Sequence, residues 1–578
     1  MTSRALKIKS PAFGFLGATL RKNIGAIILL SVAMLIFCPG FFITVLSETV
    51  IKPENYTSPD TLNSLYGVTV VFSCIFVCVA NYVNFAFLYK KSSSDVFHAL
   101  PLTRVSLLFS RTAAGFIGVL IPVTIGYIAL AFLTIPYPTY VVGTIPQIFS
   151  AYLINVLLML AFSAFSLIFI VCAGSGFDLV LSFGGFNLAA LAVGAIINTL
   201  CENHLSGYSN EFTGFLRVFS PIYYLAEKAV FFAEGNYALK GSADIIFGIL
   251  KYAAVFFIVA PLLYNFRKAE RGEQAYAYKF IYVICGVLAG ICGGYALSEI
   301  FTFAADTREY SVIGFVTFVI GALITTVVYG AVTDRGFKGF KQSMAVGGIS
   351  ALVYAIVAVI IMSGAFGFEK RVPAVKDVTA VTVNFDNISV DFKDPSAAIA
   401  LHKAIIDKNA DDEFKDDVDE SHVYVFIDYN LSGKGDAGNG DMLRNYYVKE
   451  SAVNKELFNI YASDERFADI YEFIEKAGKV KLNVSGDYNG SVEESEYLGG
   501  YMSADTAKNI ISVYRKELNA LGDEFFTEKQ QTSVVATLYL DVEINDGYDS
   551  IDIYTTADFP ETNRLISEYI ESDVQILH

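Results

Sequence analysis

Few residues of this chain combine the types and the spacing that catalysis or metal binding requires. The histidines form neither an HExxH motif nor a pair four residues apart, so a zinc hydrolase is not indicated. The sequence contains no GxSxG nucleophile elbow either. All seven cysteines lie within or at the ends of apolar stretches, so we expect no disulfide framework and no cysteine zinc site in the polar C-terminal part. The five histidines are His98, His204, His402, His422 and His578.

A phosphate-binding GxxxxGK[ST] loop would indicate an ATPase, and the sequence contains none. We therefore expect a protein that is not itself an enzyme and holds no cofactor. The glycine-rich stretch from Gly433 to Asp441 brings Asp436, Asn439 and Asp441 close together, and such oxygen ligands suit calcium. Their spacing is not that of an EF-hand, and a hairpin connection is the other interpretation.

One long polar and aromatic segment, Cys201 to Asp244, separates two apolar runs. Pro221 divides its aromatic part, as two short helices entering a membrane from one side would require, although an interfacial surface loop fits equally well. Glu227 and Glu234 are candidate residues of a pathway there, or simply solvated charges. Charges inside the apolar runs are sparse, which argues against ion-driven transport and for an external energy source.

The apolar runs that surround these residues are long enough to cross a membrane. Hydrophobic residues make up 54% of the chain, and the mean hydropathy is +0.48. About nine transmembrane helices are expected, at Ile24 to Leu46, Leu65 to Leu88, Ala113 to Ile135, Ala151 to Ala173, Leu179 to Leu200, Ile245 to Phe266, Phe280 to Thr302, Tyr310 to Val332 and Met344 to Phe366.

Charge divides the chain and predicts its orientation. Residues 369–578 hold 42 acidic and 20 basic side chains, whereas the rest has a net charge of +6. If the N-terminus is cytoplasmic, the inner segments hold 16 Lys and Arg and the outer ones 5. We therefore expect a multi-pass membrane protein with a cytoplasmic N-terminus and, after nine spans, an acidic C-terminal domain outside the cytoplasm.

Beyond residue 369 the periodicity changes from helical to alternating, as in Val378 to Val383. Helices are expected to begin at Asp394-Pro395, Ser463, Ser503 and Pro560, and the one capped by Ser503 to run to Leu521. Strands are expected between them, among them Lys479 to Ser485 and Val534 to Ile544. The pattern predicts a soluble α+β domain of repeated strand-strand-helix units, built as one domain or as two similar halves.

The segment from Lys90 to Arg111 is charged at both ends and has a short apolar patch, Val96 to Leu100. A loop that only returned the chain to the membrane would not need this patch. We expect a short helix along the cytoplasmic membrane face, where a soluble partner can bind.

Three stretches resemble the membrane subunits of ABC-2 type ABC transporters of Gram-positive bacteria. DVFHALPLTRVSLLFSR (Asp95 to Arg111) is similar to the cytoplasmic loop after their second helix, where an LP-x-x-R segment precedes helix three. FSPIYYL (Phe219 to Leu225) resembles the stretch before helix six, and YNFRKAER (Tyr264 to Arg271) the basic stretch after it. The resemblance covers roughly residues 1–274, six spans, and leaves residues 275–368, three more spans, and residues 369–578 outside it.

This resemblance implies a permease in the lipid bilayer of a bacterial plasma membrane. Such a permease works with a separate ATPase subunit and a second permease subunit, with no nucleic acid. The implied ATPase-docking residues are Asp95, His98, Leu100, Pro101 and Arg104. The substrate would be a drug, peptide, lipid or cell-wall-related molecule. A membrane-anchored sensor or binding protein whose outer domain recognises a cell-envelope ligand is the alternative, and a membrane-embedded enzyme is a third.

Overall fold

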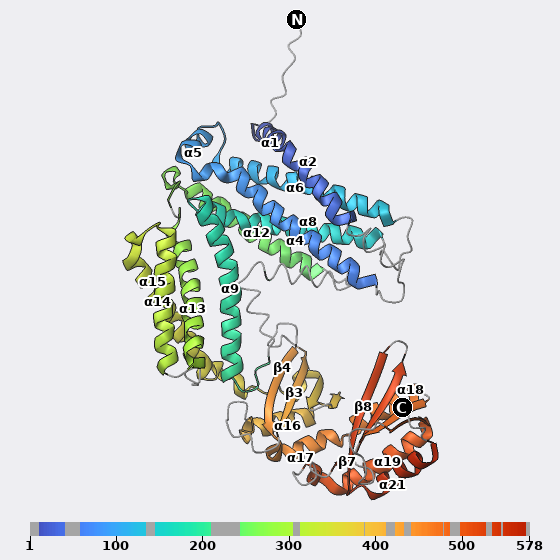
Figure 1. Cartoon of the computed structure of the whole chain (residues 1–578). Coiled ribbons are helices and arrows are strands. Elements are labelled where there is room, and N and C mark those ends of the chain that lie inside the picture. Colours follow the sequence, from blue (N-terminus) through green and yellow to red (C-terminus); the bar gives the residue numbers. More distant parts are fainter. Residues whose placement is uncertain are drawn as a thin grey trace. The chain divides into compact units, whose positions relative to one another are not determined.

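The structure of the chain is a computed structural model (Figure 1). It describes residues 11–40, 58–134, 145–209, 223, 243–274, 276–304, 312–385, 388–411, 422–432, 441–477, 479–485, 498–526, 534–544 and 547–573. The chain divides into two compact units. The helical unit comprises Met1–Ile196 and Phe215–Ala355, and the C-terminal unit comprises Ile197–Gly214 and Ile356–His578.

The described part of the helical unit consists of long apolar helices. Helices satisfy every backbone hydrogen bond within the segment, as a lipid environment requires. Among the described residues, eight helices are long and apolar enough to cross a membrane, or nine if the bent pair α1 and α2 is one span, which fits a multi-pass membrane protein. The helices are α1 (Pro11–Lys22), α2 (Ile24–Leu35), α4 (Ser58–Phe85), α6 (Arg104–Thr134), α8 (Ile145–Cys172), α9 (Gly176–His204), α12 (Ala243–Phe266), α13 (Lys279–Ala304), α14 (Val312–Thr333) and α15 (Phe340–Met362).

Polar side chains join α4 to α8 along their length. Ser73 donates to Asn155 Oδ1 at 2.5 Å, and Asn81 Nδ2 donates to Ser163 Oγ at 3.0 Å and to Ser166 Oγ at 3.1 Å. Asn81 and Asn155 are fully buried. Small and amide side chains at a helix contact allow close approach and add hydrogen bonds where hydrophobic driving force is weak.

The last three helices of this unit pack closely through glycine. A Cβ added at Gly293 of α13 would lie 1.9 Å from Thr325 Oγ1 of α14, and one at Gly330 of α14 would lie 1.9 Å from Ser343 Oγ of α15. Contacts from Cys285 and Cys292 to the carbonyl oxygens of Ser182 and Ala189 place α13 against α9, beside α14 and α15 in Figure 1.

The C-terminal unit contains two four-stranded antiparallel sheets with the same strand order, β2-β1-β3-β4 and β6-β5-β7-β8. Each pair of strands is followed by helix, so the strand-strand-helix pattern repeats. The strands are β1 (Val378–Phe385), β2 (Ile388–Phe392), β3 (His422–Leu431), β4 (Asp441–Lys449), β5 (Lys479–Ser485), β6 (Leu498–Ser503), β7 (Val534–Ile544) and β8 (Gly547–Thr556); the helices are α16 (Ser396–Asp407), α17 (Glu450–Tyr461), α18 (Asp464–Ala477), α19 (Ala504–Leu521) and α21 (Pro560–Asp573).

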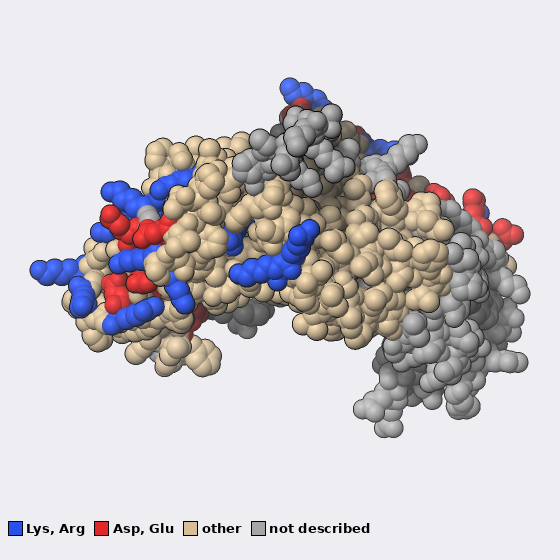
Figure 2. All heavy atoms as spheres, turned by 90° about the horizontal axis from the view of Figure 1, so that it is seen from above, with Lys and Arg blue, Asp and Glu red and all other residues tan. Residues whose placement is uncertain are grey.

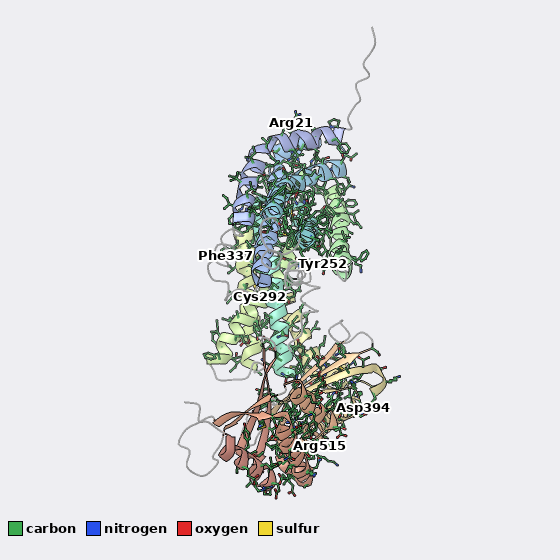
Figure 3. All side chains as sticks on the ribbon, turned by 90° about the vertical axis from the view of Figure 1, so that its right-hand side faces the viewer. Arg21, Tyr252, Cys292, Phe337, Asp394 and Arg515 are labelled. Atoms are coloured by element: carbon green, nitrogen blue, oxygen red, sulfur yellow. The ribbon has the colours of Figure 1, made fainter. Side chains whose placement is uncertain are left out.

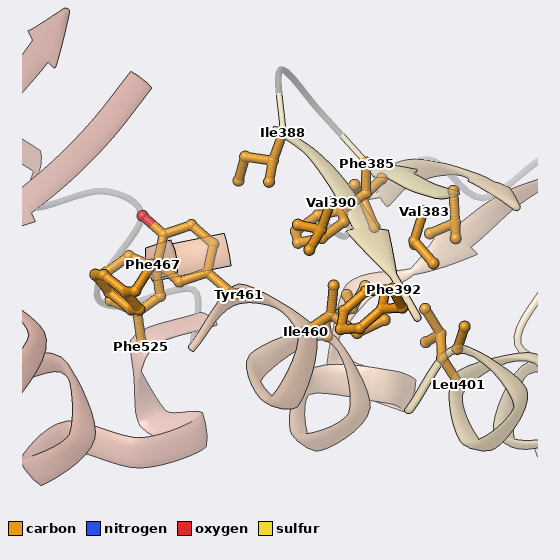
Figure 4. Packing of buried hydrophobic residues seen from close by; sticks show 14 of the residues in the cluster. Val383, Phe385, Ile388, Val390, Phe392, Leu401, Ile460, Tyr461, Phe467 and Phe525 are labelled. Atoms are coloured by element: carbon orange, nitrogen blue, oxygen red, sulfur yellow. The ribbon is translucent and has the colours of Figure 1, made fainter. Parts of the chain in front are cut away.

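One hydrophobic core serves both sheets. Alternate residues of β1 and β2, including Val383, Phe385 and Val390, face the helices, as Figure 4 shows. The core continues through Tyr461, whose hydroxyl lies 2.8 Å from that of Tyr514, into the second sheet and its helices. Because the core is continuous, the two halves of the described unit pack as one body.

Candidate functional site

The Lys90 to Arg111 segment forms a short helix between two long ones. The 3-10 turn η3 (Ala86–Tyr89) ends α4, and α5 (Lys91–His98) follows after the extended residue Lys90. Pro101 cannot continue a helix, and Thr103 Oγ1 accepts the Ser106 amide at 3.2 Å, which caps the start of α6. We call residues 86–104 the coupling segment.

The two faces of α5 differ. On the inner face, the buried Ser94 hydroxyl lies 3.3 Å from His98 Nδ1, and His98 Nε2 lies 3.2 Å from the Tyr264 hydroxyl of α12. The ring of Phe97 packs on that of Phe87, with centroids 4.4 Å apart. On the outer face Asp95 is exposed and Val96 is 66% exposed. One face of α5 therefore packs against neighbouring elements, and the other face is exposed.

Two arginines join the coupling segment to neighbouring helix ends. Arg104 donates to the carbonyl oxygens of Asn265 at 3.0 Å and Arg267 at 2.7 Å. The buried Arg267 donates to Leu88 O at 3.0 Å, Ile170 O at 3.2 Å and Val171 O at 2.5 Å. Carbonyls in the last turn of a helix have no partner within the helix. The two guanidinium groups therefore cap the ends of η3, α8 and α12 together, and we call this set the arginine junction.

A backbone bridge extends the junction to α9 and α13. Ala173, in the turn between α8 and α9, pairs antiparallel with Tyr276, and the amide of Glu273 donates to Gly174 O at 3.0 Å. A Cβ at Gly174 would lie 1.8 Å from Gln274 O, so this approach requires glycine. The Lys91 amide donates to Glu273 Oε1 at 3.4 Å, which connects α5 to the same bridge.

Burial and positive charge determine the protonation of the inner face. Burial, and then the charges of Arg104 and Arg267, lower the pKa of His98. The ring is therefore neutral near pH 7, with one nitrogen as donor and one as acceptor toward Ser94 and Tyr264. Burial also lowers the pKa of Arg267. Figure 2, which views the end of the helical unit that holds α1 and α5, shows Lys and Arg side chains gathered with Asp and Glu on one part of this face.

The structure places the predicted docking residues in two groups. Asp95 and Pro101 are exposed on the open side of the segment, and Leu100 is half-buried. His98 and Arg104 instead point inward, to Tyr264 and to carbonyls at the end of α12. Tyr264 and Arg267 contact the coupling segment through His98 and Leu88 O. They were predicted only as part of a basic stretch. A basic residue next to a span is ordinarily a solvated charge, so its burial has no signature in the sequence.

Other predicted sites lie largely outside the described residues. Pro221, Glu227 and Glu234 of the aromatic segment are not described, nor are Asp436 and Asn439 of the glycine-rich loop. Asp441 begins β4. Within the described part of the chain, no group of three or more His, Cys, Asp or Glu side chains could hold a metal ion.

Comparisons with protein-family models, with curated proteins and with solved structures find no match to this chain.

Proposed function

We propose that this chain is the membrane-spanning permease subunit of an ATP-driven transporter of the ABC-2 type, paired with a separate ATPase subunit and a second permease subunit. The excess of Lys and Arg in alternate segments supports a cytoplasmic N-terminus and a cytoplasmic α5, with the acidic C-terminal domain outside. In this proposal the coupling segment receives the ATPase, and the outer domain recognises substrate or a partner.

The observation that supports this function best is the two-sided attachment of α5. Its exposed face has the apolar Val96 beside the charged Lys91 and Asp95, a combination suited to a protein partner. Its other face is tied through His98 and the arginine junction to the ends of α8 and α12. A displacement imposed on the exposed face therefore reaches several long helices through short, directional bonds.

The test begins with a search beside this chain for a reading frame that encodes a GxxxxGK[ST] ATPase without membrane spans. The two proteins are then co-expressed, and co-purification and ATPase stimulation are measured. Val96→Asp places a carboxylate at the exposed face without touching an internal contact. We expect both readouts to fall about tenfold, as loss of one central apolar contact gives.

The matched control is Val375→Asp, because Val375 is 51% exposed and lies in the C-terminal unit. It should leave both readouts unchanged. Arg104→Glu is a poorer probe, since it also removes donors from Asn265 O and Arg267 O. If Val96→Asp binds and stimulates the ATPase like the parent chain, docking at α5 is wrong.

A further inference from the structure

Arg111 lies on the first turns of α6 and is surrounded by aromatic rings from three different elements. Its guanidinium carbon is 4.3 Å from the ring centroid of Phe97 in α5, 4.8 Å from that of Phe87 in η3 and 5.2 Å from that of Phe15 in α1. A cation within about 6 Å of a ring face is attracted by the ring quadrupole. One side chain thus contacts α1, η3 and α5 at once.

The same arginine is oriented by hydrogen bonds to the end of α4. Its Nη1 donates to Asn84 O, and Asn84 Nδ2 donates back to Arg111 O at 3.3 Å. Asn84 Oδ1 in turn accepts from Asn23 Nδ2 at 3.0 Å. Asn23 is the residue at which the chain bends by 61° between α1 and α2. A continuous set of bonds therefore runs from α5 through Arg111 to the bend.

The chemistry of these contacts selects arginine. A planar guanidinium offers its faces to rings while its N–H groups donate in the plane, whereas a lysine ammonium is a compact charge that cannot do both. Within the described residues, Nε of Arg111 is buried and has no hydrogen-bond partner. Its charge is therefore stabilised by the rings together with the Asn84 carbonyl.

We propose that Arg111 is a positioning residue that joins the coupling segment to α1, so that movement of α5 displaces α1 and the bend at Asn23. This role rests on the proposed function, in which the ATPase moves α5. Arg21, at the last turn of α1 (Figure 3), and Phe13 are exposed, so the described part of α1 is fastened mainly along the side that holds Phe15.

The experiment measures two quantities separately, the distance between α1 and α5 and the stimulation of the ATPase. Spin labels at Ala18→Cys in α1 and Val96→Cys in α5, both exposed sites, report the α1–α5 distance in the full chain in lipid. The background has the seven native cysteines replaced by alanine. Arg111→Lys, Arg111→Gln and Phe15→Leu should each broaden the distance distribution, and Phe13→Leu, on the same helix but 71% exposed, should not.

Coupling is measured with native Val96 and the co-expressed ATPase. Phe15→Leu and Arg111→Lys should retain ATPase co-purification while stimulation falls about tenfold. Misfolding would remove both together, and the conservative Phe15→Leu variant keeps the test decisive if Arg111→Gln does not fold. Unchanged distances in both Arg111→Lys and Phe15→Leu would overturn the positioning role. Should the parent chain fail to bind the ATPase while the labels still respond to Arg111, the proposed function fails and the α1–α5 connection stands.

Discussion

At the scale of single residues, Arg267 shows how one buried cation determines the geometry of several helix ends. Arg267→Met removes the donor to three carbonyl oxygens, which remain buried, at a cost of about 2 kcal/mol or more. Thermal unfolding of the purified chain in detergent should show the loss. The neighbouring Lys268 is exposed, and Lys268→Met should change stability by less than about 0.5 kcal/mol. Equal effects of the two substitutions would show that the junction does not stabilise the fold.

Burial of His402 makes the stability of the first sheet depend on pH. It is fully buried between the hydroxyls of Tyr429, at 3.1 Å, and Tyr446, at 2.7 Å, and burial, aided by the charge of Arg444, lowers its pKa from 6.5 to about 3. Between these values the unfolded chain binds more protons than the folded one, so stability is complete above about pH 6.5 and falls as the pH falls. From pH 6.5 to pH 5 the loss is about 2 kcal/mol.

Hydrogen exchange of β3 and β4 amides in the full chain, corrected for the pH dependence of intrinsic exchange, measures this slope. His402→Gln retains a donor and an acceptor without titrating and should remove most of the slope. A slope of the same size in His402→Gln would assign it to other groups.

At the scale of elements, Glu517 of α19 caps a different helix. Its carboxylate accepts the amides of Glu561 at 2.8 Å and Thr562 at 3.0 Å, the first turn of α21. A negative charge there also interacts favourably with the helix dipole. Glu517→Gln should therefore destabilise α21 by about 1 kcal/mol, seen as faster local hydrogen exchange. Glu475, 67% exposed in its pair with Lys508, supplies the control, since Glu475→Gln should be near neutral.

A loop after α9 completes the first sheet of the C-terminal unit. Gly207, at φ +73°, lies against Tyr446, and a Cβ there would be 2.4 Å from the ring. Its carbonyl accepts the Asn445 amide at 3.4 Å, and Asp411 accepts from both Ser206 Oγ, at 2.6 Å, and the Tyr447 amide, at 3.1 Å. The loop thus covers the edge strand β4, which would otherwise offer unpaired backbone groups.

Gly207→Ala should release this loop and increase proteolysis and hydrogen exchange at Leu205 to Tyr208 and in β4. Gly522 is the control that separates backbone strain from the contact with Tyr446. It also has a positive φ, +66°, but has nothing within 4 Å of an added Cβ. Gly522→Ala therefore measures backbone strain alone, about 1 kcal/mol. If both substitutions have the same local effect, the contact with Tyr446 contributes nothing.

The elements that the sequence predicts well are those with local signals. Ser503 was expected to cap a helix to Leu521, and its hydroxyl accepts the Thr506 amide at the start of α19. The expected strands Lys479 to Ser485 and Val534 to Ile544 match β5 and β7. Docking of the Gly207 loop and burial of Arg267 depend instead on residues more than 80 positions away, and no periodicity or capping pattern records such contacts.

At the scale of the whole molecule, the number of crossings decides on which side of the membrane α1 lies relative to α5 and the C-terminal unit. In the described part of the chain, the bent pair α1 and α2 makes the difference between eight spans and nine. Seven of the described spans, from α6 to α15, separate α5 from the C-terminal unit, so these two lie on opposite sides of the membrane whether or not the pair crosses. If the pair crosses, α1 begins on the side of α5, as the charge count favours. If α1 and α2 do not cross, α4 is the first crossing, and α1 lies on the side of the C-terminal unit, across the membrane from α5.

Cysteine labelling in intact cells tests whether α5 and the C-terminal unit lie on opposite sides. Phe13→Cys in α1, 71% exposed, tests the α1–α2 crossing, because it should react only after permeabilisation if the pair crosses and without permeabilisation if it does not. Val375→Cys, exposed in the C-terminal unit, should react with a membrane-impermeant maleimide, whereas Val96→Cys in α5 should react only after permeabilisation, with the parent chain as the background control. Because both sites are at least half exposed, weak labelling of one reflects the membrane rather than burial. Labelling of both sites from the same side would exclude an odd number of crossings between α5 and the C-terminal unit, and with it both the eight-span and the nine-span arrangement. It would also leave the proposed transporter without an outer recognition domain.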